Sequence, residues 1–204
     1  KVGGFATLQF GQVALVNWAA GGKSSVSATM IGNAFANYKN GRHTVDNTFD
    51  GTWGIIKNKG ENIRKNSDFL GINSKYGYAL KAEDSKWSVG ALMDFKSQFT
   101  NGFDYSDDGT EKTLSSKFGA PAYMTLSLGF DYKPNDQFSL FLSPATGKFT
   151  FVRKDVIIDE TRYGLDAGKT IRAEFGAYMR ANLQKEIFKN VTLRSTLEVF
   201  NNYT

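Results

Sequence analysis

The chain has 204 residues, no Cys, a formal net charge of +5 and a mean hydropathy of −0.36. Its basic residues are scattered and form no stripe interleaved with aromatic residues, so nucleic acid is not expected as a partner. No apolar run approaches the roughly 18 residues that a membrane-spanning helix needs. Membrane-spanning strands are not excluded, because their lipid-facing residues alternate with polar ones and keep the average hydropathy low.

The N-terminal quarter predicts three strands. Residues 5–16 are strand-like, although their two faces are poorly separated, and a Gly-rich break follows at 17–23. Residues 25–38 and 44–56 alternate between apolar and polar side chains, which is typical of strands with one apolar face. Between them, Asn40-Gly41 is a strong hairpin signal.

The next hairpin has the same pattern. A charged loop is expected over residues 57–66, then alternating strands over 70–81 and 87–98 with a short turn at 82–86. A long polar loop is expected from residue 100 to about 119.

The clearest alternation lies between residues 122 and 133. Apolar side chains occupy every second position, namely Ala122, Met124, Leu126, Leu128, Phe130 and Tyr132. The sequence Lys133-Pro134-Asn135-Asp136 predicts a turn before the strand that starts at Phe138. These arms exceed the roughly five or six residues of an ordinary strand and match the roughly nine to eleven of a tilted membrane-spanning strand.

The C-terminal part predicts a long loop over residues 153–169 and a final hairpin, with strands at 171–183 and 191–203 and a turn at 185–190. Connections then alternate between short (near 40, 84, 135 and 187) and long (near 61, 109 and 160), as in outer-membrane barrels. Aromatic residues near the predicted strand ends are candidates for girdles at the two membrane interfaces; they are Tyr38, Trp53, Trp87, Phe99, Tyr132, Phe138 and Tyr203.

We therefore predict an all-β fold, an antiparallel up-and-down transmembrane β-barrel. It forms one domain over residues 1–204, with the first strand and an external loop in 1–24 and four hairpins in 25–204. About nine strands are visible, and single-chain bacterial barrels have even counts. The expectation is therefore a barrel of ten to twelve strands and a chain that is truncated at its C-terminus.

The polar faces carry charges of both signs, which we interpret as a structural network inside the barrel. Its members are Asp46, Asp50, Asp94, Lys96, Arg172, Glu174, Arg180, Arg194 and Glu198. Enclosed charges are costly unless paired, and a small barrel has little room once side chains fill it. The mixed signs therefore favour a plugged interior over a conduit.

The sequence contains no constellation that supports catalysis, and no cofactor or metal is expected. His43, the only histidine, falls on a predicted hairpin turn and is interpreted as solvated, since a catalytic base needs partners within hydrogen-bond reach. Asp104, Asp107 and Asp108 suggest calcium at first sight. Ser115, however, stands where an EF-hand has its closing Glu, so a solvated loop is favoured.

Three stretches resemble a known family: NWAAGG at 17–22, KNSDFLGINSKYGY at 65–78 and YKPNDQFSLFLSPATGKFTFV at 132–152. They are similar to an uncharacterised family from Bacteroidota, domain of unknown function 3078. The resemblance implies an outer-membrane barrel and brings no catalytic residues with it.

The expected function is that of an integral, non-catalytic outer-membrane barrel, acting as a structural or accessory subunit of an envelope assembly. Its expected partners are the lipid bilayer with lipopolysaccharide and other outer-membrane proteins. Two alternatives stay open: a passive, porin-like narrow channel and, at the level of the fold, a soluble lipocalin-like binding barrel.

Overall fold

The fold is almost entirely strand. The structure is a computed structural model that describes residues 1–17, 22–81, 86–106, 112–156 and 160–203. The strands are β1 (Val2–Val13), β2 (Ser25–Asn40), β3 (His43–Asn58), β4 (Arg64–Ala79), β5 (Trp87–Ser97), β6 (Gly102–Tyr105), β7 (Lys112–Ser116), β8 (Ala122–Asn135), β9 (Phe138–Phe151), β10 (Ile171–Phe188) and β11 (Val191–Asn202). A single 3₁₀ turn, η1 (Glu160–Tyr163), lies between β9 and β10. Among the described residues no helix is long and apolar enough to span a membrane.

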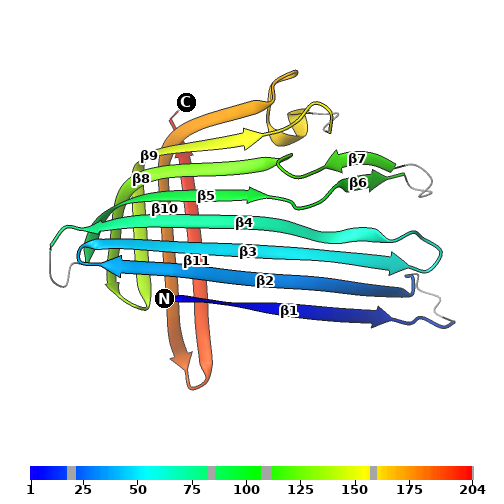
Figure 1. Ribbon diagram of the computed structural model, residues 1–204, viewed down its shortest axis with the longest axis horizontal. Helices are drawn as coiled ribbons and strands as arrows, with labels where there is room; N and C mark the ends of the chain where they lie inside the picture. Colours follow the sequence, from blue (N-terminus) through cyan, green and yellow to red (C-terminus); the bar gives the residue numbers. More distant parts are fainter. Residues whose placement is uncertain (18–21, 82–85, 107–111, 157–159, 204) are drawn as a thin grey trace.

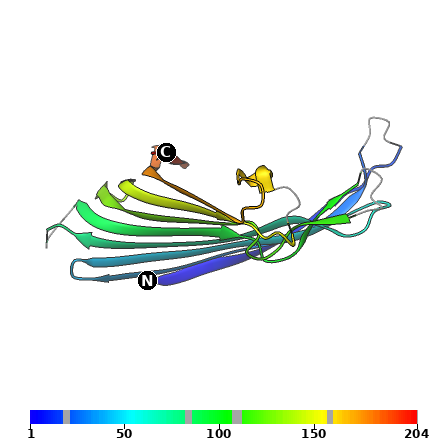
Figure 2. The ribbon, with the colours of Figure 1, turned by 90° about the horizontal axis from the view of Figure 1, so that it is seen from above.

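Nine of the strands form one antiparallel up-and-down sheet in the order β1-β2-β3-β4-β5-β8-β9-β10-β11. The sheet is twisted and strongly curved, so that β10 and β11 cross the direction of β1–β4 at a steep angle (Figures 1 and 2). The all-β, up-and-down architecture predicted from the sequence is confirmed. Closure is not found: within the described residues the edge strands β1 and β11 do not pair with each other.

Several strands are longer than the alternation predicts. The charged loop expected over 57–66 shrinks to 59–63, because β3 continues to Asn58 and β4 begins at Arg64. The prediction of a long connection there is therefore wrong. The predicted turn at 185–190 is likewise reduced to Lys189-Asn190, where Asn190 adopts a positive φ of 64°. At these ends consecutive polar residues interrupt the alternation that marks a strand, at 57–58 in β3, 64–68 in β4 and 184–186 in β10.

Two predicted turns are displaced by one to three residues. Pro134 lies within β8 at an irregularity of the β8–β9 register, and Asn135 already pairs with Phe138. The turn itself is closed by the Asn135 side chain, whose Oδ1 accepts hydrogen bonds from Gln137 N and Phe138 N, both at 3.0 Å. His43 is the first residue of β3, paired with Asn40, and is not on the turn.

The long connections contain structure that the sequence did not predict. The expected polar loop at 100–119 holds the two-stranded sheet β6–β7. The loop after β9 folds back so that Val152, Val156 and Leu165 form a buried apolar cluster with Ala120, against which Leu114 and Tyr163 pack. Figure 2 shows this loop, with η1, rising on the concave side of the sheet.

Candidate functional site

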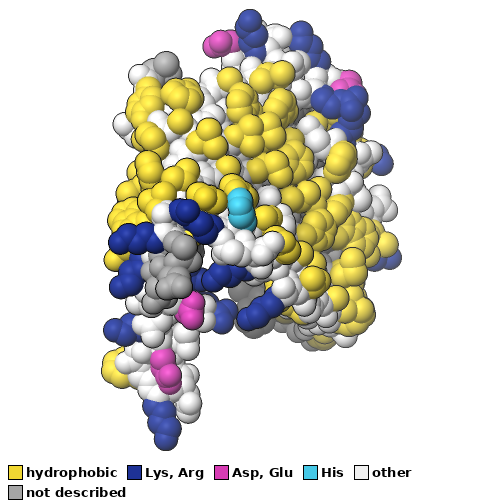
Figure 3. Space-filling model, turned by 60° about the vertical axis from the view of Figure 1, so that its left-hand side comes forward, with side chains coloured by type: hydrophobic (Ala, Val, Ile, Leu, Met, Phe, Trp, Pro, Cys, Tyr) yellow, Lys and Arg dark blue, Asp and Glu magenta, His cyan; other side chains and the backbone are white. Residues whose placement is uncertain are grey.

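The candidate site is the sheet itself, because its two faces differ in chemistry. Cross-strand register places Met30 beside Trp53, Phe49 beside Ile72, and Phe95 beside Met124 on one face. Many of these apolar side chains are exposed, as are Leu126 (42%), Leu128 (63%) and Val199 (45%). Because a water-soluble domain rarely exposes a continuous apolar surface of this extent, this convex face needs an apolar covering. The space-filling view shows its hydrophobic side chains as a broad field (Figure 3).

Aromatic residues stand at both ends of the convex face. At the end with the short turns, Trp87 packs on Tyr132 with ring centroids 4.6 Å apart, and His43 lies edge-on to Tyr78 at 5.1 Å. At the other end, Trp53 Nε1 donates to Thr100 Oγ1 over 3.3 Å, and Phe175 meets Tyr203 at 5.7 Å. The aromatic residues picked from the sequence thus lie near strand ends.

The concave face carries the charges that the sequence singled out, and several are brought together in pairs. Arg172 Nη2 lies 2.8 Å from Glu174 Oε1, and Lys96 Nζ lies 3.1 Å from Asp94 Oδ1. Across the last hairpin, Arg180 Nε lies 3.3 Å from Glu198 Oε1, although it makes no well-aligned hydrogen bond. Pairing of opposite charges is thus the rule in the central part of this face.

Three members of the predicted network are arranged differently. Asp50 Oδ1 accepts a hydrogen bond of 2.7 Å from Asn33 Nδ2 and makes no ion pair within the described chain. Asp46 is exposed and lies beside Lys75 in register, but the Lys75 ammonium is directed elsewhere. Arg194 is exposed on β11, opposite Gln184. Asp46 and Arg194 are therefore exposed to solvent, and Asp50 is hydrogen-bonded to a neutral side chain.

A well-buried ion pair between β4 and β8 was not among the predicted residues. Lys75 Nζ on β4 lies 2.5 Å from Asp131 Oδ1 on β8, and the two side chains are only 23% and 11% exposed. The pair reaches across β5 at a row of aligned glycines, Gly77, Gly90 and Gly129. A Cβ on Gly90 would meet Tyr76 O at 2.9 Å and the Phe141 ring at 3.6 Å. Absence of side chains in this row lets the pair span three strands.

The concave face also keeps three hollows. One of about 350 Å³ lies among Asp50, Lys75, Asp94, Arg180 and Glu198, and one of about 380 Å³ is lined by Thr125, Lys148, Tyr178 and Glu198. A third of about 760 Å³ opens at the end with the short turns. Charge pairing therefore leaves solvent-sized space beside the network.

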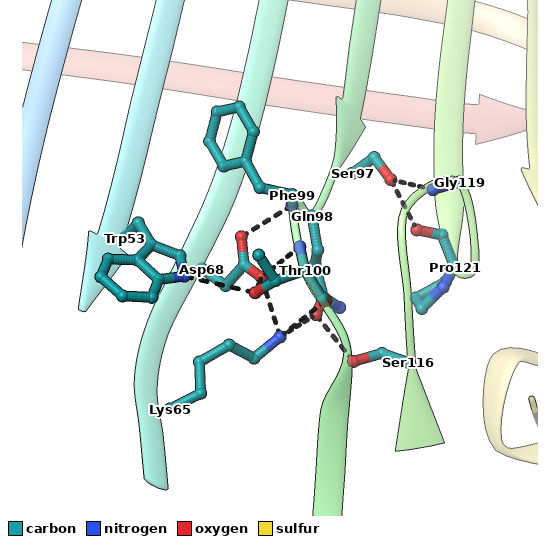
Figure 4. Close-up of polar contacts among 10 residues, drawn as sticks. All are labelled: Trp53, Lys65, Asp68, Ser97, Gln98, Phe99, Thr100, Ser116, Gly119 and Pro121. Carbon is teal, nitrogen blue, oxygen red and sulfur yellow. Dashed lines mark hydrogen bonds and ion pairs between the residues drawn. The ribbon is translucent and has the colours of Figure 1, made fainter. Parts of the chain in front are cut away.

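The root of the β6–β7 hairpin is fixed by a set of polar contacts around Asp68 (Figure 4). The Asp68 carboxylate accepts hydrogen bonds from Phe99 N at 2.7 Å and from Thr100 N at 2.9 Å. It also forms an ion pair with Lys65, whose Nζ lies 2.8 Å away. Lys65 Nζ also donates to Gln98 Oε1, which accepts from Ser116 Oγ on β7. These contacts join β4 to the start and the end of the hairpin.

Ion pairs hold the other connections at this end. Hydrogen bonds from Lys117 and Arg153 to Asp155 lower the pKa of that carboxyl to about 2. Hydrogen bonds from Lys23 and Asn58, with the charge of Arg64, lower the pKa of Glu61. Both carboxylates remain ionised at neutral pH, so the connections are tied to one another by charge.

No catalytic or metal-binding constellation is found among the described residues. His43 Nδ1 lies 2.8 Å from the Tyr76 hydroxyl, and neither group has a carboxylate partner. Groups of three or more His, Asp or Glu side chains that could hold a metal ion are not found in the described part of the chain. Asp107 and Asp108 of the acidic run lie outside it.

Comparison with known proteins gives a family match over part of the chain. Neither the curated proteins nor the solved structures gave a match. The matched family segment contains two of the three stretches on which the resemblance rests, those at 17–22 and 65–78, and ends before the third. Residues 10–103 match the model described as "Protein of unknown function (DUF3078)", and the resemblance to that family is thereby confirmed over this part of the chain.

Proposed function

We propose that the protein is an integral, non-catalytic barrel of a bacterial outer membrane, with a structural or accessory role in an envelope assembly. The observation that carries the proposal is the apolar convex face with aromatic residues at both ends. On β3, Trp53 follows His43 by ten positions, which corresponds to about 33 Å of strand. At a tilt of about 40° this spans about 25 Å, the height of the apolar band of outer-membrane barrels.

The barrel would be completed by further strands. A nine-stranded sheet has two unpaired edges, and long free edges are sites of uncontrolled pairing. Bacterial single-chain barrels have even strand counts. We therefore propose ten to twelve strands in all, with the added strands pairing β1 and β11.

A structural role is supported by the pairing of charges on the concave face. Lys75 with Asp131, Asp94 with Lys96, and Arg180 with Glu198 occupy space that a pore would leave to water. A passive narrow channel is the second candidate, and the observation in its favour is the pair of hollows of about 350 and 380 Å³ beside those charges. Steady ion conductance of the purified protein in planar bilayers would favour the channel.

Extraction behaviour tests membrane insertion. The protein is expected to require detergent for extraction from native membranes and to migrate faster on a gel before boiling than after it, because a closed barrel stays compact in detergent. Monodisperse protein in detergent-free buffer, with no change of migration on boiling, would contradict the proposal and favour the soluble, lipocalin-like barrel.

A further inference from the structure

The largest of the three hollows described above lies at the end with the short turns, and its lining is rich in cations. Its volume is about 760 Å³, within the range of small-molecule sites. Its lining includes Lys39, Arg42, Lys81, Lys86 and Lys133, in addition to Lys1. Figure 3, which brings this end forward, shows Lys and Arg side chains gathered below the hydrophobic field.

Strand register brings these cations close together. Lys133 N of β8 donates to the carbonyl oxygen of Lys86, the residue before β5, over 2.8 Å, so the two residues lie side by side. Leu80 N donates to Trp87 O, which places Lys81, just after β4, near the same level. Like charges directly opposite one another are destabilising. The fold therefore gathers charges of the same sign at the rim of the hollow, its edge at the end with the short turns.

Little in the described chain neutralises this rim. Of the two acidic residues in the lining, Asp131 is already paired with Lys75, which leaves Asp46. Lys133 lies 3.5 Å from the fully exposed Asp136, and Lys39, Lys81 and Lys86 make no ion pair with any described residue. Glu83 and Asp84 lie outside the described residues.

The space beneath the rim is made by small side chains. Gly41, Thr44, Ala79 and Ser88 line the hollow where a strand interior would usually carry larger groups. Arg42 is fixed beside it, since its Nε donates to Ala79 O at 2.8 Å and its Nη2 to Leu80 O at 2.5 Å. Arg42 is thus fixed by hydrogen bonds to the backbone beside the hollow, while the lysine ammonium groups are free to turn toward a ligand.

We propose that this hollow is a binding site for a small, multiply charged phosphate-bearing anion that enters from the short-turn end. Lysine ammonium groups are compact point charges suited to phosphate oxygens, whereas the bidentate geometry that selects carboxylates needs a free guanidinium. Arg42, the arginine of the lining, already donates hydrogen bonds from its Nε and Nη2 to backbone carbonyl groups. This site goes beyond the proposed structural role. It lies on the concave face whatever covers the convex one, so its test does not depend on membrane insertion.

Titration calorimetry of the detergent-solubilised protein with inorganic tripolyphosphate tests the site. Saturable binding that weakens as salt is raised is expected, with citrate binding more weakly. Lys86→Gln combined with Lys133→Gln should weaken tripolyphosphate binding by about tenfold or more, because two of the ammonium groups that attract the phosphate oxygens are lost.

Lys59→Gln is the matched control, since Lys59 lies at the opposite end of the sheet, between β3 and β4, and is expected to leave binding unchanged. Far-ultraviolet circular dichroism, which reports the strand content, shows that each variant is folded. Absence of saturable binding by the unmodified protein overturns the site. An equal loss in the control overturns it as well, and citrate binding as tightly as tripolyphosphate overturns the phosphate preference.

Discussion

Replacement of Leu126 by Arg is expected to destabilise the protein in lipid vesicles by about 2–4 kcal/mol, the cost of a cation at the midplane of a barrel's lipid face. Leu126 stands near the middle of β8 on the convex face and is 42% exposed. In a water-soluble protein the same exposed substitution would change stability by about 0.5 kcal/mol or less. Denaturant titration of the refolded variant in vesicles measures the difference.

Thr125→Arg is the matched control for this prediction. Thr125 is the preceding residue and lines the concave hollow that also contains Asp94 and Glu198. An added guanidinium there has water and two carboxylates around it, as well as the ammonium groups of Lys96 and Lys148, so an effect smaller than that of Leu126→Arg is expected. Equal effects of the two substitutions would show that the convex and the concave face are in contact with the same solvent.

Lys75→Ala is expected to destabilise the protein by about 3 kcal/mol, because it leaves the Asp131 carboxylate enclosed without its partner. Asp131 is 8% exposed and receives the Lys75 ammonium at 2.5 Å. Equilibrium unfolding in urea, in the presence of detergent or lipid, measures the loss.

Lys96→Ala is the control, since its pair with Asp94 is 45% exposed on the lysine side and exposed pairs contribute about 1 kcal/mol at most. The double variant Lys75→Met with Asp131→Leu should recover most of the lost stability, because an apolar pair of similar volume often replaces a buried ion pair without cost. Equal stability of Lys75→Ala and Lys96→Ala would show that Asp131 is hydrated.

The nine strands of the main sheet follow from local information. Most carry an apolar face at every second position, as in the run from Ala122 to Tyr132, and the turn at Gly41 has the positive φ of 54° that its glycine permits. Alternation is interrupted by consecutive polar residues at the ends of β3 and β10, at 57–58 and 184–186, and these ends were therefore predicted too short. The strands β6 and β7, with four and five residues, are too short for a clear alternation and were predicted as loop.

The charge network can be predicted only in part from the sequence. Arg172 with Glu174, and Lys96 with Asp94, lie two positions apart on one strand and must share a face. The Lys75–Asp131 pair needs long-range information instead, since 56 residues separate its members and β5 lies between their strands. The glycine row over which this pair reaches is visible only once the strand register is known.

The central claim, that the convex face contacts lipid and the concave face contacts water, can be measured residue by residue. The chain has no cysteine, so a spin label can be placed on single-Cys variants along residues 123–130 of β8 and compared for accessibility to oxygen and to a water-soluble nickel chelate in membranes. We predict that oxygen accessibility peaks at Met124, Leu126, Leu128 and Phe130. Nickel accessibility is expected to peak at Tyr123 and Thr125 of the concave face, since Ser127 and Gly129 are buried. Nickel access to Leu126 and Leu128 equal to that at Thr125 would contradict the account.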